Sequence, residues 1–244
     1  MKYKNLLSTF AIASVVLFAS CEKDESETSN PIEIPVQTTV KTTISLAGAS
    51  NFAILAGSEI TNTGETVITG DIGLSPGTSI GGFPPGVLNG TVHINDSIAN
   101  QAKLDLTAAY NDAAARTSTD AVTLSGNIGG LILTPGLYFS TSSLSVSSGD
   151  LTFDAMGDTN AVFIIQIASS FTTTSGRKVI LSKGALASNI FWKVGSSATF
   201  GTTSVMKGTV LAAESITFNT GATLDGRALT SIGEVTLEGN TIKK

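Results

Sequence analysis

Hydrophobic and polar residues alternate with a period of two near the C-terminus, and the alternation recurs at a fixed distance. The segment Ala198-Thr199-Phe200 returns as Ile216-Thr217-Phe218 after 18 residues and as Val235-Thr236-Leu237 after a further 19. A second element shares the 18-residue spacing, since Gly208-Thr209-Val210-Leu211 matches Gly226-Arg227-Ala228-Leu229. Two strand types in one short repeat are typical of a β-solenoid, in which stacked coils bury a continuous core. A repeat of this length leaves room for about three short strands and their corners.

The polar positions of the repeat predict a regular outer surface. Side chains alternate across a strand, so the apolar residues of each repeat face the core and the residues between them face outward. The outward residues are hydroxyl-bearing with one exception, and they are Ser197 and Thr199, Ser215 and Thr217, and Glu234 and Thr236. Stacked coils lie about 4.8 Å apart, so these side chains are predicted to form a flat grid.

The same alternation occurs earlier in the chain. Thr123, Thr152 and Thr172 each lie between apolar residues or at the end of an apolar strand, and Ser170 precedes Thr172 by two. Thr173 occupies a position where an apolar residue is expected. Following the pattern back to Thr61 predicts one outward column of threonines along the whole solenoid.

Two further patterns predict how the solenoid is covered. Segments 161–167 and 189–194 are nearly continuous apolar runs, which are typical of strands buried on both faces. Segment 97–115 has helical periodicity, and Asp96 or Asn95 is a candidate N-cap. We expect this helix to lie over the two apolar runs through residues at helical spacing, which are Ile98, Ala102, Leu106, Ala109 and Ala113. Segment 75–96 begins with a dense Pro/Gly stretch and is predicted to be a capping loop.

The N-terminus is predicted to be a targeting region. Residues 1–20 have a basic start and a short apolar run, as in a signal peptide. The single cysteine, Cys21, ends a segment that resembles the lipobox of bacterial lipoproteins, and a lone cysteine cannot form an internal disulfide. The alternative is an ordinary signal peptide with an incidental cysteine. Residues 21–41 are acidic and polar and are predicted to be a flexible tether, so one folded domain is expected at 42–244.

Composition narrows the choice of partner. Only 14% of the 244 residues are charged, 33 are threonine, and the net charge is −5. A surface with so few charges must be covered largely by hydroxyl and small side chains. Because no Lys/Arg cluster is present to contact phosphates, we do not expect the protein to bind nucleic acid.

The residues that carry catalysis are scattered. His93 is the only histidine, and no second histidine or cysteine lies near it to form a metal or nucleophile site. The carboxylates, among them Asp71, Asp150 and Asp154, form no motif with a fixed acid/base partner. No phosphate loop, dinucleotide fingerprint or zinc spacing occurs. Although parallel β-helices include polysaccharide lyases and hydrolases, we therefore expect no enzyme activity, metal or cofactor.

Seven segments in a fixed order resemble the bacterial and fungal ice-binding protein family with a discontinuous β-solenoid. Two of them read Thr134-Pro135-Gly136-Leu137-Tyr138 and Asn189-Ile190-Phe191-Trp192-Lys193-Val194. The others occupy residues 49–56, 69–77, 109–116, 160–166 and 219–228. Together they extend over nearly all of residues 44–243. The resemblance implies a right-handed, triangular solenoid with one long helix along a face, a capping region, and first and last segments that lie side by side.

The resemblance also implies a site. Ice-binding strands of the family often read Thr-Ala/Gly-X-Thr/Asn, with the second and fourth residues outward. The residues expected to contact ice are Thr123, Thr152, Ser170, Thr172, Ser197, Thr199, Ser215, Thr217 and Thr236. This chain departs from the motif at its first position, where Ser196, Glu214 and Gly233 stand, and at Glu234, which introduces a charge. The centre of the face is therefore expected between Thr172 and Thr217.

The predicted function is ice binding, with thermal hysteresis and inhibition of ice recrystallisation. Ice is the expected partner, the protein is expected to be a monomer, and a lipid on Cys21 would hold it to the outer membrane, facing the cell surface, unless it is secreted. The alternative is a surface adhesin or polysaccharide-binding β-helix, for which three Tyr and one Trp offer little sugar stacking. From periodicity alone, the threonine column is also compatible with the ordinary β propensity of threonine.

Overall fold

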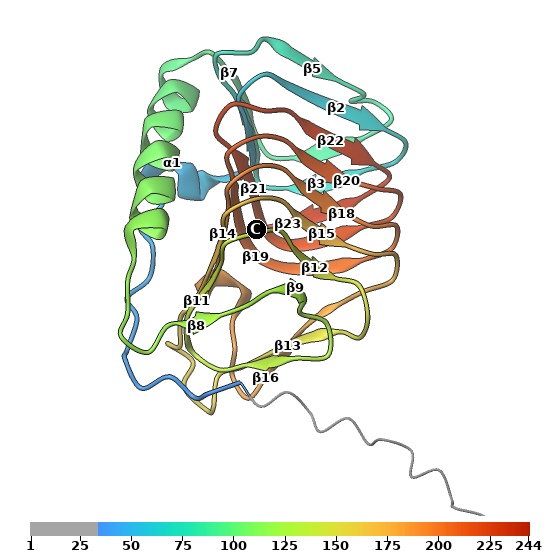
Figure 1. Ribbon diagram of the computed structural model, residues 1–244. Helices are drawn as coiled ribbons and strands as arrows, with labels where there is room; N and C mark the ends of the chain where they lie inside the picture. Colours follow the sequence, from blue (N-terminus) through green and yellow to red (C-terminus); the bar gives the residue numbers. More distant parts are fainter. Residues whose placement is uncertain (1–33) are drawn as a thin grey trace, which may run out of the picture. The chain divides into compact units, whose positions relative to one another are not determined.

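The computed structural model describes residues 34–244. The predicted signal peptide 1–20 and the lipidation site Cys21 lie outside the described residues. The described chain forms parallel sheets of twelve, eight and three strands, wound as a β-solenoid with one long helix beside it (Figure 1). No helix within 34–244 is long and apolar enough to cross a membrane.

One side of the solenoid is an eight-stranded parallel sheet, which we call the hydroxyl sheet. Its strands, in spatial order, are β5 (Ser79–Gly81), β2 (Glu59–Thr63), β22 (Val235–Glu238), β20 (Ile216–Phe218), β18 (Ala198–Phe200), β15 (Phe171–Thr173), β12 (Leu144–Val146) and β9 (Gly126–Asn127). The 18-residue repeat gives this register directly, because Ala198 pairs with Ile216 and Ile216 pairs with Val235.

The second side lies under the helix, and we call it the helix side. Its strands are β7 (Val92–Ile94), β4 (Asp71–Leu74), β1 (Phe52–Ala56), the C-terminal halves of β21 (Thr223–Thr230) and β19 (Val205–Ala212), β17 (Ile190–Val194), β14 (Phe163–Ile167), β11 (Gly136–Ser140) and β8 (Val122–Thr123).

The third side is built from β6 (Val87–Asn89), β3 (Val67–Thr69), β23 (Thr241–Lys243), the N-terminal halves of β21 and β19, β16 (Val179–Ser182), β13 (Leu151–Asp154) and β10 (Ile132–Leu133). Strands β19 and β21 turn from the third side to the helix side at two paired glycines, Gly208 and Gly226. Both have positive φ, and a Cβ on Gly226 would lie 2.0 Å from the carbonyl oxygen of Gly208. Glycine is required there because the two coils approach so closely.

The coils are not stacked in chain order, as the resemblance implied. Strands β1, β2 and β3 pair with β21, β22 and β23 through Ile54 with Ala228, Ile60 with Val235, and Val67 with Thr241. In Figure 1 the blue and cyan strands of the first coil accordingly lie beside the red strands of the last. The N-terminal strands thus lie inside the stack, near its upper end, with only β4 to β7 beyond them.

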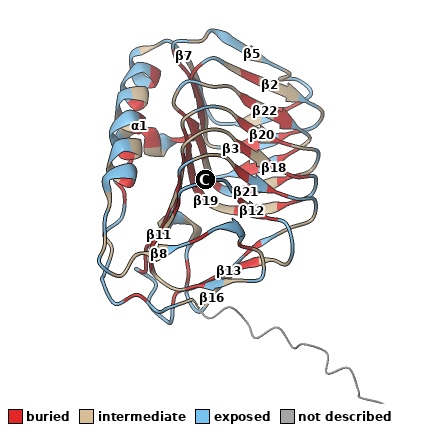
Figure 2. Cartoon of the chain, viewed as in Figure 1, coloured by how far each residue is buried: buried red, intermediate tan, exposed pale blue. Residues whose placement is uncertain are grey.

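Alternation places an apolar ladder inside the solenoid (Figure 2). Phe171, Phe200 and Phe218 are fully buried and contact one another in sequence, with ring centroids 6.2 and 4.8 Å apart. Trp192 stacks on Phe171 at 4.7 Å and donates its indole N–H to the carbonyl of Lys207. Close packing of large rings makes the sheets resist bending.

The helix α1 spans Ser97–Ala115, as predicted, and Asp96 caps it by accepting a hydrogen bond from the amide of Ala99 at 2.7 Å. The helix buries Ala99, Ala102, Leu106, Ala109 and Ala113. Ile98 was expected in this stripe, but its side chain is 51% exposed and Ala99 takes the inner position. The apolar runs of β14 and β17 lie beneath the helix, as expected, through Ile164 and Phe191.

Lys103 joins the helix to the turn that enters the hydroxyl sheet. Its ammonium donates to the carbonyls of Thr230 and Ser231 at 2.5 and 2.7 Å. Burial lowers the pKa of Lys103 to about 8. Because the unfolded chain retains this proton to higher pH, stability rises with pH between about 8 and the ordinary lysine pKa. At neutral pH the charged amine thus ties the helix to the end of β21.

Two predicted boundaries need correction. The segment 75–96 is not a structureless loop, because it contains β5, β6 and β7, which pair with β2, β3 and β4. Short strands of three residues escaped the prediction because the Pro/Gly signal lies between them.

The predicted tether 21–41 is also wrong over its described part, since Gln37 is only 8% exposed and residues 38 and 39 are hydrogen-bonded to the domain. Two short 3-10 helices, η1 (Ala47–Asn51) and η2 (Ala187–Asn189), complete the fold.

Equivalent corners beside the hydroxyl sheet use the same left-handed backbone. Gly176 has φ 72°, Gly221 has φ 70° and Gly239 has φ 59°, and between the first two Thr203 has φ 56°. Backbone hydrogen bonds stack these positions, from Gly176 to the carbonyl of Thr202 at 2.9 Å and from Gly221 to that of Glu238 at 3.1 Å. Thr203 is therefore a β-branched residue at a corner position where the neighbouring coils have glycine.

Replacing Thr203 with glycine is expected to stabilise the protein by up to about 1 kcal/mol. The left-handed conformation costs an L-residue roughly 1–2 kcal/mol, and the added backbone freedom of glycine offsets about half of that. Thermal unfolding monitored by circular dichroism measures the change. The adjacent Thr202→Gly serves as the control, because Thr202 has ordinary φ and should lose stability. A lower melting temperature for Thr203→Gly would contradict the interpretation that the backbone at Thr203 is strained.

Candidate functional site

The outer surface of the hydroxyl sheet carries one unbroken column of polar side chains. Strand pairing places Thr172 opposite Thr199, Thr199 opposite Thr217, and Thr217 opposite Thr236. The column continues to Thr61 at one end. At the other end Ser145 and Asn127 complete it, through the pairs with Thr172 and with each other. From Ser145 to Thr236 each residue of the column lies between two buried neighbours, so this part of the column is regular.

A second outward row runs two residues before the first. Backbone hydrogen bonds align it, because Phe171 donates to Ser197 at 3.1 Å, Ala198 to Ser215 at 2.9 Å, and Ile216 to Glu234 at 2.9 Å. The hydroxyls of Ser143 and Ser170 are 2.8 Å apart. The row is thus serine over four coils and becomes acidic at Glu234 and Glu59.

Seven of the nine predicted residues lie together on this sheet: Ser170, Thr172, Ser197, Thr199, Ser215, Thr217 and Thr236. Thr123 does not, because it lies in β8 and pairs with Phe139 on the helix side. Thr152 lies in β13 and pairs with Ile132 and Ile180 on the third side. The placement of these two residues in the column is therefore wrong. An apolar-Thr-apolar pattern reports which way a side chain faces, but it occurs on all three sides of the solenoid.

Sequence reasoning missed Ser145 and Asn127, although a signal for Ser145 was present. Ser143 and Ser170 are 27 residues apart, as are Ser147 and Thr174, which approach at 3.2 Å. Coils at this end of the solenoid are therefore longer than the 18-residue coils at the C-terminus. Applying a 27-residue period to Thr199 and Thr172 leads directly to Ser145. The side-chain Oδ1 of Asn127 accepts hydrogen bonds from the amide of Gly129 in its own turn at 3.1 Å and from the amide of Ser147 on the next coil at 2.8 Å.

Thr173, which the pattern placed on the core side, is indeed buried. It pairs with Phe200 and Val146, and its side-chain oxygen accepts a hydrogen bond from the amide of Gly201 at 3.0 Å. The buried hydroxyl is satisfied at the corner of the sheet. Thr173 therefore does not contribute to the outer surface.

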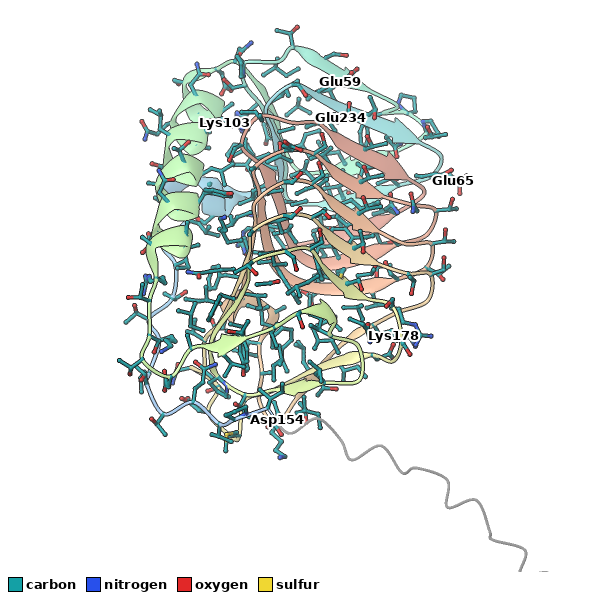
Figure 3. All side chains as sticks on the ribbon, viewed as in Figure 1. Glu59, Glu65, Lys103, Asp154, Lys178 and Glu234 are labelled. Atoms are coloured by element: carbon teal, nitrogen blue, oxygen red, sulfur yellow. The ribbon has the colours of Figure 1, made fainter. Side chains whose placement is uncertain are left out.

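Charge is confined to the upper end and the margins of the hydroxyl sheet. Glu59 and Glu234 lie on neighbouring coils at the upper end (Figure 3), and Ser79 donates a hydrogen bond to Glu59 at 2.8 Å. At one margin the carboxylate of Glu214 accepts hydrogen bonds from Ser196 at 2.8 Å and from Ser197 of the serine row at 3.4 Å. None of the ion pairs formed by residues 34–244 involves a glutamate. The threonine column from β15 to β20 carries no charge, and Glu214 is the acidic side chain that reaches the serine row there.

The histidine and several aspartates outside the hydroxyl sheet have structural partners. His93 bonds Asp96 through Nδ1 at 2.6 Å and meets the ring of Phe52 edge-on, beside the start of α1. The amide of Ala99 and the imidazole of His93 lower the pKa of Asp96. Asp150 pairs with Arg177 at 3.6 Å. Within the described chain, no three His, Cys, Asp or Glu residues gather to hold a metal ion.

Comparison with known proteins supports the interpretation of this surface. The sequence model described as "Ice-binding-like" matches residues 54–243. This range includes every strand of the hydroxyl sheet. The chain belongs to the ice-binding-like family. The prediction of that family from seven motifs is confirmed, and the name of the family refers to ice binding rather than to catalysis.

Relatives in the ice-binding-like family cover most of the chain. An ice-binding protein from Nostoc sp. (strain HG1) is 45% identical over 201 residues, which are 82% of this chain and 74% of the relative. The crystal structure of an ice binding protein from an Antarctic biological consortium superposes with a TM-score of 0.86 at 73% identity, covering 86% of this chain and 95% of that one. The structure of an ice-binding protein from Antarctomyces psychrotrophicus gives 0.77 at 40% identity, covering 83% and 98%. These similarities confirm the predicted fold class.

Proposed function

We propose that this protein binds ice through the outer surface of the hydroxyl sheet, centred on β15, β18 and β20. The observation that carries the proposal is the in-register column of Thr172, Thr199 and Thr217, which is flanked by the serine row and free of charge. Relatives named as ice-binding proteins support it. No covalent chemistry is involved.

The mechanism is adsorption by a rigid grid. Each outward threonine offers a hydroxyl and a methyl group, and the coils repeat them at about 4.8 Å. Such a grid holds first-shell water close to the positions that water takes in ice. The buried ring ladder keeps the sheet flat, so little conformational entropy is lost when the surface meets ice. Protein fixed on the growing front stops local growth, which gives thermal hysteresis and prevents recrystallisation.

Sugar binding has less support than ice binding. Stacking on a saccharide needs an exposed aromatic face. Trp192 and Tyr138 are completely buried, and the ring of Tyr110 lies under the ammonium of Lys193 at 5.0 Å. The described tyrosines and the tryptophan therefore lie inside the solenoid or on the helix, away from the hydroxyl sheet.

We also propose that the protein is exported and acts outside the cell. Export, a lipid on Cys21 and display at the outer membrane would present the ice-binding surface outside the cell, and a secreted form would act in the surrounding medium. The sequence pattern at 1–27 supports this part of the proposal. A monomer is sufficient, because one hydroxyl sheet supplies the complete surface.

The test of ice binding is the behaviour of a single ice crystal in a nanolitre osmometer. Purified residues 34–244 are expected to facet the crystal and to hold it without growth below its melting point. Bovine serum albumin at the same concentration is the control. A crystal that grows as a smooth disc, as it does in buffer, would contradict the proposal.

Replacing Glu234 with serine is expected to increase thermal hysteresis by roughly 1.5-fold. A carboxylate resists losing its hydration, whereas serine would extend the neutral row to β22 and enlarge the adsorbing area. Glu65→Ser is the matched control, because Glu65 is exposed on the turn between β2 and β3, outside both rows. Hysteresis that stays at the wild-type value in Glu234→Ser would show that Glu234 does not limit the surface.

A further inference from the structure

Residues 34–43, which we call the clasp, cross the end of the solenoid where α1 ends and β11 begins. The carboxylate of Asp120 accepts hydrogen bonds from the amides of Thr38 and Thr39, both at 2.8 Å. The same carboxylate pairs with the buried ammonium of Lys41 at 3.3 Å, and Ser118 bonds both groups. The Ser118 hydroxyl and the amides of Thr39 and Thr38 hold the pKa of Asp120 well below its usual range. Asp120 therefore stays charged and holds the clasp over the physiological range of pH.

A second attachment joins the clasp to the helix. Arg116, directly after α1, donates to the side-chain oxygen of Thr42 at 2.7 Å. Its guanidinium is oriented by Asp112, with both contacts at 2.8 Å. Charge-assisted, two-point contacts of this kind are the stronger hydrogen bonds in proteins. The last turn of α1 and the clasp are thus tied together.

The third attachment is a side chain inserted into the solenoid. Gln37 accepts a buried hydrogen bond from the amide of Leu137 at 2.8 Å. Strand β8 pairs with β11 only from Tyr138 onward, so the glutamine replaces a missing strand partner for Leu137. A Cβ at Gly136 would lie 2.2 Å from the Gln37 side chain. The site therefore requires glycine at 136 and fits an extended glutamine closely.

The path of the chain beyond the clasp gives these contacts a role. Ile44 and Leu46 are buried beneath the helix, and η1 then leads into β1. Strand β1 is paired on both edges, with β21 and with β4. In Figure 1 the blue segment from residue 34 runs across the lower end and up the helix side, away from the hydroxyl sheet. Tension applied at residue 34 must break the clasp before it reaches β1.

We propose that residues 34–43 act as a force-bearing clasp for a protein that is held at its N-terminal side while its hydroxyl sheet is held by ice. Tension is taken up by Asp120, Arg116 and Gln37. If it reached β1 directly, it would pull β1 and then β2 out of the stack, and Thr61 of the column would be lost. The clasp thus preserves the flat surface under load. The biological need for the clasp rests on the proposed function. The order in which the clasp and the solenoid break under tension does not depend on ice binding.

The test is single-molecule pulling on residues 34–244 without ice. One handle is attached at residue 34 and the other at Thr217→Cys on the hydroxyl sheet. The expected first event lengthens the chain by no more than about 36 Å, the reach of ten extended residues, and the solenoid ruptures later at higher force. A first event much longer than this would mean that β1 is pulled out with the clasp, and it would overturn the proposal.

A double variant, Gln37→Ala with Asp120→Asn, should lower the force of the first event and leave that of the second unchanged, whereas the control Glu65→Gln should change neither. An unchanged first event would contradict the proposal.

Hydrogen exchange of the wild-type protein provides a test that needs no variant. The amides of Thr38, Thr39 and Leu137 should exchange far more slowly than those of an unstructured peptide, and rates equal to the peptide's would overturn the clasp. Because none of these experiments uses ice, a protein that failed to bind ice would give the same results.

Discussion

Replacing Thr217 with tyrosine is expected to reduce thermal hysteresis at least roughly three-fold and to leave the circular dichroism spectrum unchanged. Thr217 lies at the centre of the column, opposite both Thr199 and Thr236. A ring at this position would stand above the neighbouring rows and keep them from the ice lattice, so a preorganised surface would lose its fit. The fold should persist because Ile216 and Phe218, on the inner side of β20, keep their buried positions.

The matched control for this change is Thr223→Tyr. Thr223 is half-buried, as Thr217 is, and it also stands in a regular register, between Val205 and Thr241, but on the third side of the solenoid. That side carries the ion pair between Lys207 and Asp225 at 3.0 Å, so it is not a neutral grid. Hysteresis should be unchanged in Thr223→Tyr. Full hysteresis in both Thr217→Tyr and Thr199→Tyr would show that the face is assigned wrongly.

Replacing Phe200 with alanine is expected to lower the free energy of unfolding by about 3–5 kcal/mol, the range for a completely buried ring. Phe200 joins two parts of the aromatic ladder, with Phe218 at 4.8 Å and Phe171 at 6.2 Å. It lies directly beside Thr199, so the cavity would also loosen β18 under the column. Hysteresis should therefore fall together with stability. Chemical denaturation and nanolitre osmometry measure the two effects.

Phe200→Leu distinguishes packing from simple hydrophobicity. Leucine fills most of the volume, so the loss of stability should be about 1.5 kcal/mol or less and hysteresis should be nearly retained. If Phe200→Ala lost less than about 1 kcal/mol, the site would be able to collapse without cost. The stiffness of the ring ladder would then not explain the flat surface.

Much of the fold could be predicted because its signals are local and periodic. The 18-residue echo gives the register of β18 and β20, and the alternation Ala198-Thr199-Phe200 tells which side chains face out. Asp96 before an alanine-rich segment marks the start of α1. The pairing of the first coil with the last came only from the resemblance to a family, since no local pattern records that Ile54 meets Ala228.

The errors have physical causes that single strands do not reveal. Thr123 and Thr152 look like Thr199 in their immediate sequence, but the longer coils at that end of the solenoid place them on other sides. Gln37 lies in a polar segment that resembles a tether, and its burial depends on the absence of a side chain at Gly136, which is far away in the sequence. Long-range contacts of this kind decide which side a residue occupies, whereas alternation decides only whether it faces in or out.

The most direct measurement of the central claim is the partition of protein into slowly growing ice. Wild-type residues 34–244, the double variant Thr199→Tyr with Thr217→Tyr, and Thr223→Tyr would be grown into ice under identical conditions, with circular dichroism as the check on folding. We predict that the wild type and Thr223→Tyr enter the ice and that the double variant remains in the liquid. Equal incorporation of the double variant and the wild type would contradict binding through the hydroxyl sheet.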